Sequence, residues 1–376
     1  MTIYLDMSAT TPVLKEVADL AYKLMVDEYG NAGSRTHEYG AKAKTAVLLA
    51  RKQVAAVVDA DESEVIFTSG ATESNNIALL GLKSFGKDNK KKHIITSRIE
   101  HKAVLEPLDF LAAEEGFDVT YLEVGESGVV DPRDLFKALR SDTLLVSIMH
   151  VNNETGCIQP ISDICDELRE HDAFFHVDAA QSFGKLSEDL KNKRIDFISA
   201  SGHKVYAPKG IGALIVRKRG FFKAPLKPIF FGGGQEKDLR PGTLAVPLIA
   251  GFGLACEIAI INYYKWNAHA KSLKDTLIFE LDKIGAEYNG ENTSPFVLNF
   301  SIPGVNSESL MVSLKGVVAV SNGSACNSSS YNPTHVLTAM GFDENRIAGA
   351  VRFSWGPMTE TLPVNEILRR IEQVRL

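Results

Sequence analysis

The sequence predicts an α/β protein with a mostly parallel sheet covered by helices on both faces, followed by a second, smaller domain. Between residues 65 and 216, short apolar runs alternate with segments whose apolar residues recur at helical spacing. Beyond about residue 255 this alternation ends, and a long helical segment followed by short mixed elements takes its place. A chain of 376 residues is long enough to form both parts.

The first elements precede the alternation. Tyr4 and Leu5 suggest a short extended start, and Pro12 helps to open a helix whose apolar positions recur until near Gly30. A polar loop over residues 30–40 then leads into a longer helix that includes Val47, Leu48, Val54 and Val58.

The alternating region predicts strands and helices in turn. We expect strands at residues 65–67, 93–96, 119–124, 144–149 and 174–177, and helices at residues 76–82, 101–115, 131–140 and 161–170.

The stretch from Ile195 to Val216 contains two buried runs joined by a polar turn. The link is too short for a crossover helix, so one of the two strands should be antiparallel. Lys204 lies in the turn, although a lysine is ordinarily a solvated surface charge. A lysine in a partly desolvated pocket loses proton affinity and can form a Schiff base with a carbonyl compound.

The smaller domain is expected to contain a long connecting helix over residues 256–284. Its other elements are strands at 297–302, 317–320 and 351–353, and helices at 308–314, 334–340 and 364–374. We predict a large domain of residues 13–255 and a small domain made of residues 1–12 and 256–376.

Composition excludes several classes of protein. A net charge of −6 and a pI near 5.9 argue against a dedicated nucleic-acid or anionic-membrane binder. The four cysteines form no CxxC pair and no disulfide framework, and the histidines show no metal-ligand spacing, so we expect a cytoplasmic protein without a metal. No secretory signal is seen, and no run approaches the ~20 apolar residues of a transmembrane helix.

Polar residues follow several predicted strands, where ligands collect in open α/β sheets. TSGATES (residues 68–74) leads into a helix start that could bind phosphate, or could simply cap the helix. Asp178 ends a buried strand, and Gln181 follows it. The Asp178 carboxylate could accept a hydrogen bond from a protonated ring nitrogen, or it could make a cap or core hydrogen bond. His101 opens a helix, and a lone histidine is usually structural.

Two further residues are unusual for their surroundings. Arg352 lies in a strand-like run, which suggests a buried carboxylate partner, with a surface edge strand as the alternative. Cys326 lies in a loop of small polar residues, where an exposed thiol is a liability unless it reacts. The other cysteines have apolar neighbours typical of buried thiols. Gly232, Gly233 and Gly234 do not follow the strand-to-helix pattern of a dinucleotide site.

Ordered motifs along nearly the whole chain match one known family. They are YLDMSATTP, TSGATESNN, EHKAV, VSIMHVNNETG, HVDAAQSFGK, SGHKVYAPKGIGAL, GGGQE followed by LRPGTL, SNGSAC and VRFSWG. The sequence therefore resembles the pyridoxal 5'-phosphate (PLP) dependent cysteine desulfurases, in the branch that includes the nitrogen-fixation and housekeeping iron–sulfur enzymes.

The resemblance implies the aspartate-aminotransferase-like fold (fold type I), with a large seven-stranded domain, and a homodimer with active sites at the subunit interface. Lys204 would hold PLP through a Schiff base, and His101 would stack on its ring. The remaining implied cofactor contacts are Ala71, Thr72, Ser201 and His203 at the phosphate, Thr243 at the phosphate of the other subunit, Asp178 at the pyridine nitrogen, and Gln181 and Asn152 on the ring hydroxyl side.

The same resemblance implies the reaction. L-cysteine would bind with its carboxylate on Arg352, helped by Asn152 and Asn31, and Lys204 would move its α-proton. Cys326, on a loop that can move, would attack the substrate sulfur to give an enzyme persulfide and L-alanine, with His101 as an acid/base. The sulfur would then pass to an acceptor protein.

Departures from the family pattern leave the acceptor open. RPGT stands in place of RSGT, and GNAGS in place of a GNPS-like loop. The sequence ends soon after its last expected helix, whereas housekeeping relatives carry a further segment that helps to dock an iron–sulfur scaffold. Iron–sulfur assembly, tRNA thiolation and DNA phosphorothioation all remain candidates, with delivery to proteins and no direct binding of nucleic acid.

Two other functions are possible on the same fold. One is a selenocysteine lyase or another PLP-dependent lyase or transferase, although a plain aminotransferase needs no such thiol. The other is a non-catalytic sulfur-relay protein, which would not need Lys204, Asp178, His101 and Arg352 together.

Overall fold

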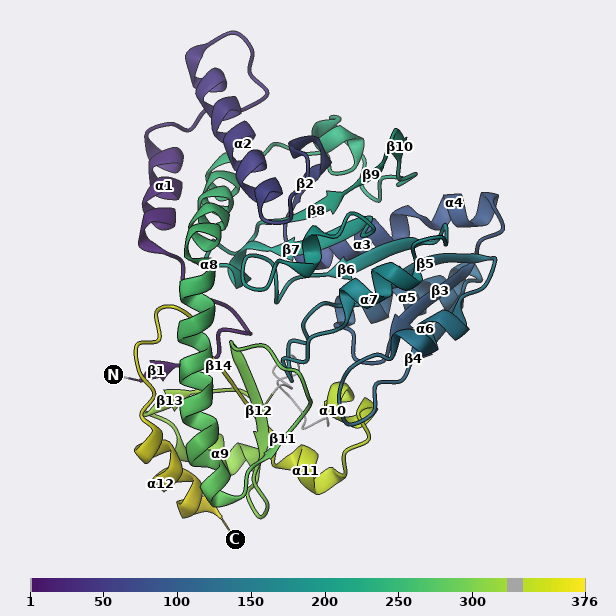
Figure 1. Cartoon of the computed structure of the whole chain (residues 1–376). Coiled ribbons are helices and arrows are strands. Elements are labelled where there is room, and N and C mark those ends of the chain that lie inside the picture. The colour runs from purple at the N-terminus through teal and green to yellow at the C-terminus, as the bar shows by residue number, and fades with distance from the viewer. Residues whose placement is uncertain (1, 323–333, 376) are drawn as a thin grey trace.

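The computed structural model describes residues 2–322 and 334–375. Figure 1 shows a large sheet flanked by helices, with a smaller group of strands and helices below it. Within the described residues the large sheet has seven strands in the order β2-β8-β7-β6-β5-β3-β4. Their bounds are β2 Val65–Thr68, β3 His93–Ser97, β4 Asp118–Leu122, β5 Thr143–Ser147, β6 Phe174–Asp178, β7 Phe197–Ser201 and β8 Gly212–Val216.

Strand β8 is antiparallel to both of its neighbours, while β3 to β7 pair in parallel. The prediction of one antiparallel strand beside the Lys204 turn is therefore confirmed. The link contains only the 3-10 turn Gly202–Lys204 and a short loop, which is too little chain for a crossover helix.

Helices lie between successive strands from β2 to β6, and all but the short second one were predicted. They are α3 (Ala71–Gly81), α4 (Lys83–Asp88), α5 (Lys102–Glu115), α6 (Pro132–Ala138) and α7 (Ile161–Glu167). Asp131 caps α6 by accepting the Arg133 N–H at 2.9 Å, next to Pro132 at the first helical position. Helix α3 begins five residues earlier than expected, at Ala71, so it starts directly at the edge of the sheet.

The long helix α8 (Val246–Leu281) begins ten residues before the predicted start at residue 256. The sequence GFGL looks like a helix break, but the glycines serve packing. A Cβ at Gly253 would lie 2.5 Å from the Cα of Ala50 in α2 (Glu38–Ala56), so only glycine lets the two helices approach so closely. Helix α1 (Lys15–Val26) also contacts α8, and Figure 1 shows α8 running from the large sheet to the lower group of strands.

Among the described residues, the segment Val246–Ile284 has the length and apolar composition of a membrane span. The sequence expectation that no such run exists was therefore wrong. Half of its most apolar window is buried within the protein, and a core helix meets the same criteria of length and composition.

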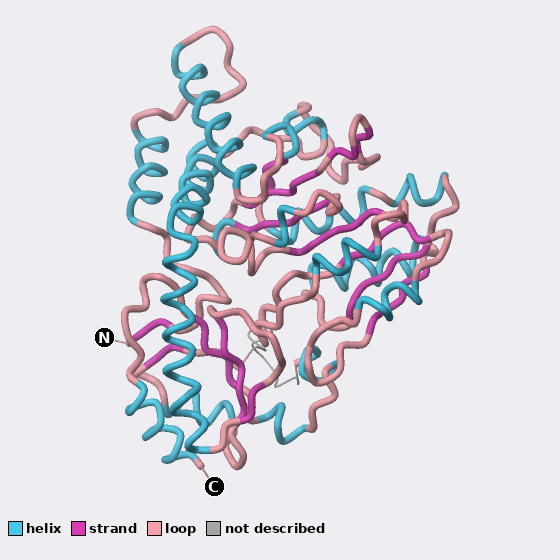
Figure 2. The backbone as a smooth tube through the Cα atoms, viewed as in Figure 1, coloured by secondary structure: helices cyan, strands magenta, loops and turns pink. Residues whose placement is uncertain are grey.

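The lower group joins the two ends of the chain. Strand β1 (Ile3–Tyr4) pairs in parallel with β13 (Val318–Ala319), and Asp6 bridges to Ser354. Figure 2 shows these strands in magenta beside the sheet made by β11 (Glu287–Tyr288), β12 (Val297–Ser301) and β14 (Val351–Ser354). The helices of this lower group are α9 (Ser307–Ser313), α10 (His335–Ala339), α11 (Glu344–Ala348) and α12 (Val364–Val374). A separate small hairpin, made of β9 (Lys218–Arg219) and β10 (Phe222–Lys223), extends from the large sheet. The domain boundaries stay a prediction, and α8 is continuous across residue 255.

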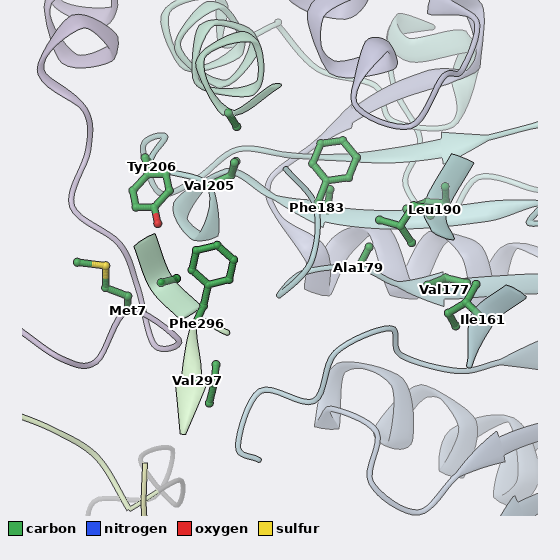
Figure 3. Packing of buried hydrophobic residues seen from close by; sticks show 14 of the residues in the cluster. Met7, Ile161, Val177, Ala179, Phe183, Leu190, Val205, Tyr206, Phe296 and Val297 are labelled. Atoms are coloured by element: carbon green, nitrogen blue, oxygen red, sulfur yellow. The ribbon is translucent and has the colours of Figure 1, made fainter. Parts of the chain in front are cut away.

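Buried apolar side chains link the two groups of strands. In Figure 3, Met7 and Phe296 flank Tyr206, which lies in the segment after Lys204. The same cluster contains Val177 and Ala179 at the end of β6. Because this packing is continuous, the Lys204 turn is fixed against both groups of strands.

The ion pair of Arg51 and Glu236 predicts a large effect on stability. Arg51 Nη2 lies 2.5 Å from Glu236 Oε1, and the two side chains are only 15% and 2% exposed. Glu236 Oε2 also accepts the Phe67 N–H at 2.7 Å. We expect Arg51→Ala to lower the free energy of unfolding by about 3–5 kcal/mol, because it leaves a buried carboxylate without its cation.

Arg133→Ala is the matched control, since its pair with Asp131 is largely exposed. Chemical denaturation should show almost no change for this variant. Equal small losses for both variants would contradict the prediction.

Candidate active site

A cavity of about 600 Å³ opens where β6 and β7 end. Such a position follows from the parallel sheet, whose strands carry their carboxyl ends to one edge. The structure brings most of the predicted site residues together here, as the cavity is lined by Ala71, Thr72, His101, Asp178, Gln181, Ser201, His203, Lys204 and Arg352.

Lys204 is held by the N-terminal segment. Its Nζ donates to the carbonyl of Ala9 at 2.9 Å and to that of Ser8. The neighbouring His203 ring lies 3.2 Å from Thr10 Oγ1, and burial together with the charge of Lys204 lowers the pKa of His203 to about 4. His203 is therefore neutral at physiological pH and can act as a hydrogen-bond donor or acceptor without adding charge.

Asp178 has hydrogen bonds on both carboxylate oxygens. Oδ2 accepts the Asn75 amide at 2.8 Å, and Oδ1 accepts the Ala180 N–H at 2.9 Å. The core hydrogen bond considered from the sequence is thus present, and Asp178 also lines the cavity. Gln181 donates from Nε2 to the Ser8 carbonyl at 2.9 Å, while its buried Oε1 has no partner among the described residues.

The start of α3 faces the cavity beside Ser201. The first N–H groups of a helix lack intrahelical acceptors, and here they open onto the cavity at Ala71 and Thr72. Gly70 fits against β8 only because residue 212 is also glycine, since a Cβ there would lie 2.6 Å from the Gly70 Cα. Glu73 fixes the turn by accepting the Ser69 N–H at 2.5 Å and the Arg240 guanidinium at 2.9 Å.

Arg352 is almost fully buried and has the carboxylate partner that the sequence predicted. Its Nη2 lies 2.5 Å from Asp6 Oδ1, and its Nη1 donates to the Asn153 carbonyl at 2.9 Å. The buried Nε has no hydrogen-bond partner within the part of the chain that the structure describes. The Nε–H of this fixed guanidinium is therefore among the donors left for another acceptor.

His101 caps α5 and lines the cavity. Its Nδ1 accepts the Ala103 N–H at 3.0 Å, so the neutral ring carries its proton on Nε2. Desolvation lowers the pKa of His101, the positive charge of Lys204 adds to this effect, and the charge of Asp178 opposes it.

Three predicted residues do not line the cavity. Asn152 is fully buried, and its Oδ1 accepts the N–H groups of Glu154 and Thr155 in a turn after β5, while its Nδ2 donates to the Ile99 carbonyl at 3.0 Å. Its amide is thus used within the protein, and Asn153 lines the cavity instead. Asn31 is exposed, and its Oδ1 accepts the Gly33 N–H in the loop after α1. Thr243 is exposed beside a second cavity.

The predicted nucleophile, Cys326, lies outside the described residues.

Sequence reasoning missed several residues of this site. Ser8 and Ala9 contribute only backbone carbonyls, which any residue could supply, and Asn75 follows a helix start without any unusual spacing. Asp6 is one acidic residue near the N-terminus, and nothing in its neighbours points to Arg352. These contacts join residues far apart in the chain, so only the tertiary fold reveals them.

The family model described as aminotransferase class-V matches residues 3–366. The chain belongs to the class-V aminotransferase family. It is 45% identical over 374 residues to the mitochondrial cysteine desulfurase of Saccharomyces cerevisiae, covering 98% of this chain and 74% of the relative. It is 46% identical over 381 residues to cysteine desulfurase IscS of Vibrio campbellii, covering 100% and 92%. These relatives place the chain among the cysteine desulfurases.

Solved structures agree with this family. A NifS-like protein superposes with a TM-score of 0.88 at 36% identity, covering 100% of this chain and 98% of the other. DndA from Streptomyces lividans gives 0.82 at 48% identity, covering 94% and 99%. A structure of SspA in complex with cysteine gives 0.82 at 40% identity, covering 95% and 99%. The predicted fold class is therefore confirmed.

A buried histidine below Asp178 predicts a pH-dependent stability. His176 Nδ1 lies 2.8 Å from Ser147 Oγ and its Nε2 lies 3.0 Å from Ser199 Oγ, and burial lowers the pKa of His176 from 6.5 to about 4. Because the unfolded chain binds this proton more tightly, the contribution is complete above pH 6.5 and is lost as the pH falls toward 4. By pH 5 the loss should be about 2 kcal/mol.

The measurement is the free energy of unfolding at pH 7.5 and at pH 5, for the wild type and for His176→Asn. The variant should lose less stability between the two values, although His203 still contributes because its pKa is also lowered. Parallel curves for the two proteins would refute the assignment.

Proposed function

We propose that this protein is a PLP-dependent cysteine desulfurase that converts L-cysteine to L-alanine. The sulfur would be left as a persulfide on Cys326 and passed to an acceptor protein. The observation that carries this proposal is the presence of an amine, a carboxylate and a buried guanidinium, from Lys204, Asp178 and Arg352, around one cavity.

The residues of the cavity fit PLP. The start of α3, with Ser201 and the neutral His203, suits its phosphate, and the carboxylate of Asp178 suits a protonated ring nitrogen. The Oε1 of Gln181 is buried and has no partner among residues 2–322 and 334–375, so the ring hydroxyl would satisfy it. When bound, PLP supplies an aldehyde for amines and a ring that takes up electrons released from the substrate.

Arg352 would bind the substrate carboxylate. Asp6 and the Asn153 carbonyl hold one side of the guanidinium, which fixes its plane and leaves Nε as a donor. A fixed guanidinium pairs with a carboxylate at low entropic cost, and this contact would orient L-cysteine before any bond breaks.

Lys204 and His101 would handle protons. The carbonyls of Ser8 and Ala9 aim the Lys204 amine, which would take the α-proton and return it during formation of alanine. His101 presents a neutral ring with its proton on Nε2, so it can donate there. The Cys326 thiolate would attack the substrate sulfur, forming an S–S bond as the C–S bond breaks, and the carbon would gain a proton to give alanine.

We also propose a homodimer in the cytoplasm. Thr243 is exposed at a second cavity of about 900 Å³ that shares Ser69 and Thr72 with the first one. This position supports a role for Thr243 at the phosphate of a partner subunit. The pathway that receives the sulfur is open among the three candidates above, and Asn31 remains a proposed substrate contact.

Replacement of Cys326 tests the persulfide step. Cys326→Ala should lower sulfide and alanine formation from L-cysteine by about 100-fold or more, because the nucleophile that accepts the sulfur is gone. The visible absorbance of bound PLP should remain. Full turnover by the variant would refute the role of Cys326, and turnover of selenocysteine alone would favour the lyase alternative.

Replacement of Lys204 tests the attachment of the cofactor. Borohydride reduction should fix PLP covalently to the wild type but not to Lys204→Ala, because the attaching amine is missing. Mass spectrometry of the intact protein gives the readout. Lys223→Ala, at an exposed lysine of β10, is the control and should behave as the wild type. A wild-type protein that takes up no PLP would overturn the proposed function.

A further inference from the structure

The turn of residues 98–101 between β3 and α5 is fixed by contacts from distant parts of the chain. The carbonyl of Ile99 accepts Asn152 Nδ2 at 3.0 Å. The carbonyl of Glu100 lies 3.0 Å from His335 Nε2, which must donate because a carbonyl only accepts. His101 is the next residue and lines the cavity, so both contacts fix the backbone that carries its ring.

Glu100 adds a third contact through its side chain, which is fully buried. Its Oε1 accepts the hydroxyl of Ser97 at 2.6 Å and the N–H of Met149 at 3.0 Å. Ser97 ends β3, and Met149 follows β5, so one carboxyl group bridges the ends of two neighbouring strands.

The surroundings of the Glu100 carboxyl group favour its protonated, uncharged form. Its Oε2 has no hydrogen-bond partner, and no cation forms an ion pair with it within the described part of the chain. A buried carboxylate in such surroundings is costly. Burial accordingly raises the pKa of Glu100 to about 8.

We propose that Glu100 is a positioning residue that sets the place and the tautomer of His101 by tying its turn to Ser97 and Met149. This inference rests on the proposed function only in assigning His101 a task beside the cofactor. The contact between Glu100 and Met149 joins the turn to the chain that continues to Asn153, which also lines the cavity.

The chemistry of this bridge selects the test variants. Glutamine keeps an acceptor oxygen at the same reach and is neutral, so Glu100→Gln should preserve the turn. Alanine removes the acceptor and leaves the Met149 N–H and the Ser97 hydroxyl without it, so Glu100→Ala should release the turn. Glu114→Ala is the control, because Glu114 is exposed on the same helix α5.

The first experiment is an NMR titration of the His101 ring in the protein without added cofactor. In the wild type, Glu100→Gln and Glu114→Ala, the neutral ring should be one tautomer, with its proton on Nε2, and its pKa should be lowered. In Glu100→Ala both tautomers should appear, and the pKa should rise toward 6.5. A wild-type titration in Glu100→Ala, or equal impairment in Glu100→Gln, would overturn the proposal.

The second experiment measures the rate constant for release of PLP. Glu100→Ala should release PLP about tenfold faster, since a misplaced His101 supports the ring less well. In a His101→Ala background the same change should add nothing, whereas a general loss of structure would accelerate release in both backgrounds. If Glu100→Ala does not fold, Glu100→Asp replaces it, because a side chain shorter by one methylene cannot bridge both groups.

The two experiments separate the failure of this inference from that of the proposed function. If the wild type binds no PLP, the proposed function fails, while the NMR titration still decides the role of Glu100. If PLP binds and all variants titrate and release it alike, only the positioning role fails.

Discussion

Residues 6–11 contact both the turn that carries Lys204 and the strand that carries Arg352. The Thr11 N–H and hydroxyl donate to the His203 carbonyl at 2.9 and 3.1 Å, and Thr11 Oγ1 accepts the Tyr206 N–H at 3.0 Å. At the other end, Asp6 binds Arg352, and Ser8 donates its N–H to Ser354 Oγ at 2.8 Å. The position of the Lys204 amine relative to the Arg352 guanidinium thus depends on this short segment, whose residues 7–9 form a turn.

Several buried titratable groups at and near the site are neutral. His203 and His176 have a lowered pKa, and Glu100 has a raised pKa, so all three are uncharged near pH 7. Asp178 and Arg352 line the same cavity as His203. Charges are weakly screened in a protein interior. Because these three groups are neutral, the electrostatic field at the cavity depends on only a few charged side chains.

The sheet explains why these groups meet at all. Strands β5, β6 and β7 are parallel, so Met149, Asp178 and Ser201 lie at one edge although they are far apart in sequence. Strand β8 returns antiparallel and brings Gly212 against Gly70, so β8 packs closely on the turn before α3. The chain is similar to cysteine desulfurases in sequence, and its sheet brings these residues to one edge.

The residue pattern alone predicts the α/β class, the mostly parallel sheet, the antiparallel strand beside the Lys204 turn, and Lys204, Asp178 and Arg352 as unusual polar side chains. These follow from local hydrophobic periodicity, link length and polar residues directly after buried runs. The sequence misplaced the start of α8, because close helix packing through Gly253 looks locally like a break. It also assigned Asn152 to the cavity, whereas its amide bonds are used in the turn after β5.

The groups that hold these side chains in place are visible only in the folded protein. The Ser8 and Ala9 carbonyls at Lys204, Asn75 at Asp178, Asp6 at Arg352 and the Glu100 bridge to Met149 have no local signature. Each contact joins segments distant in sequence, and a backbone carbonyl or a buried acid looks the same in the sequence wherever it lies. Local pattern therefore identified the reactive side chains, and three-dimensional packing determined their orientation and protonation.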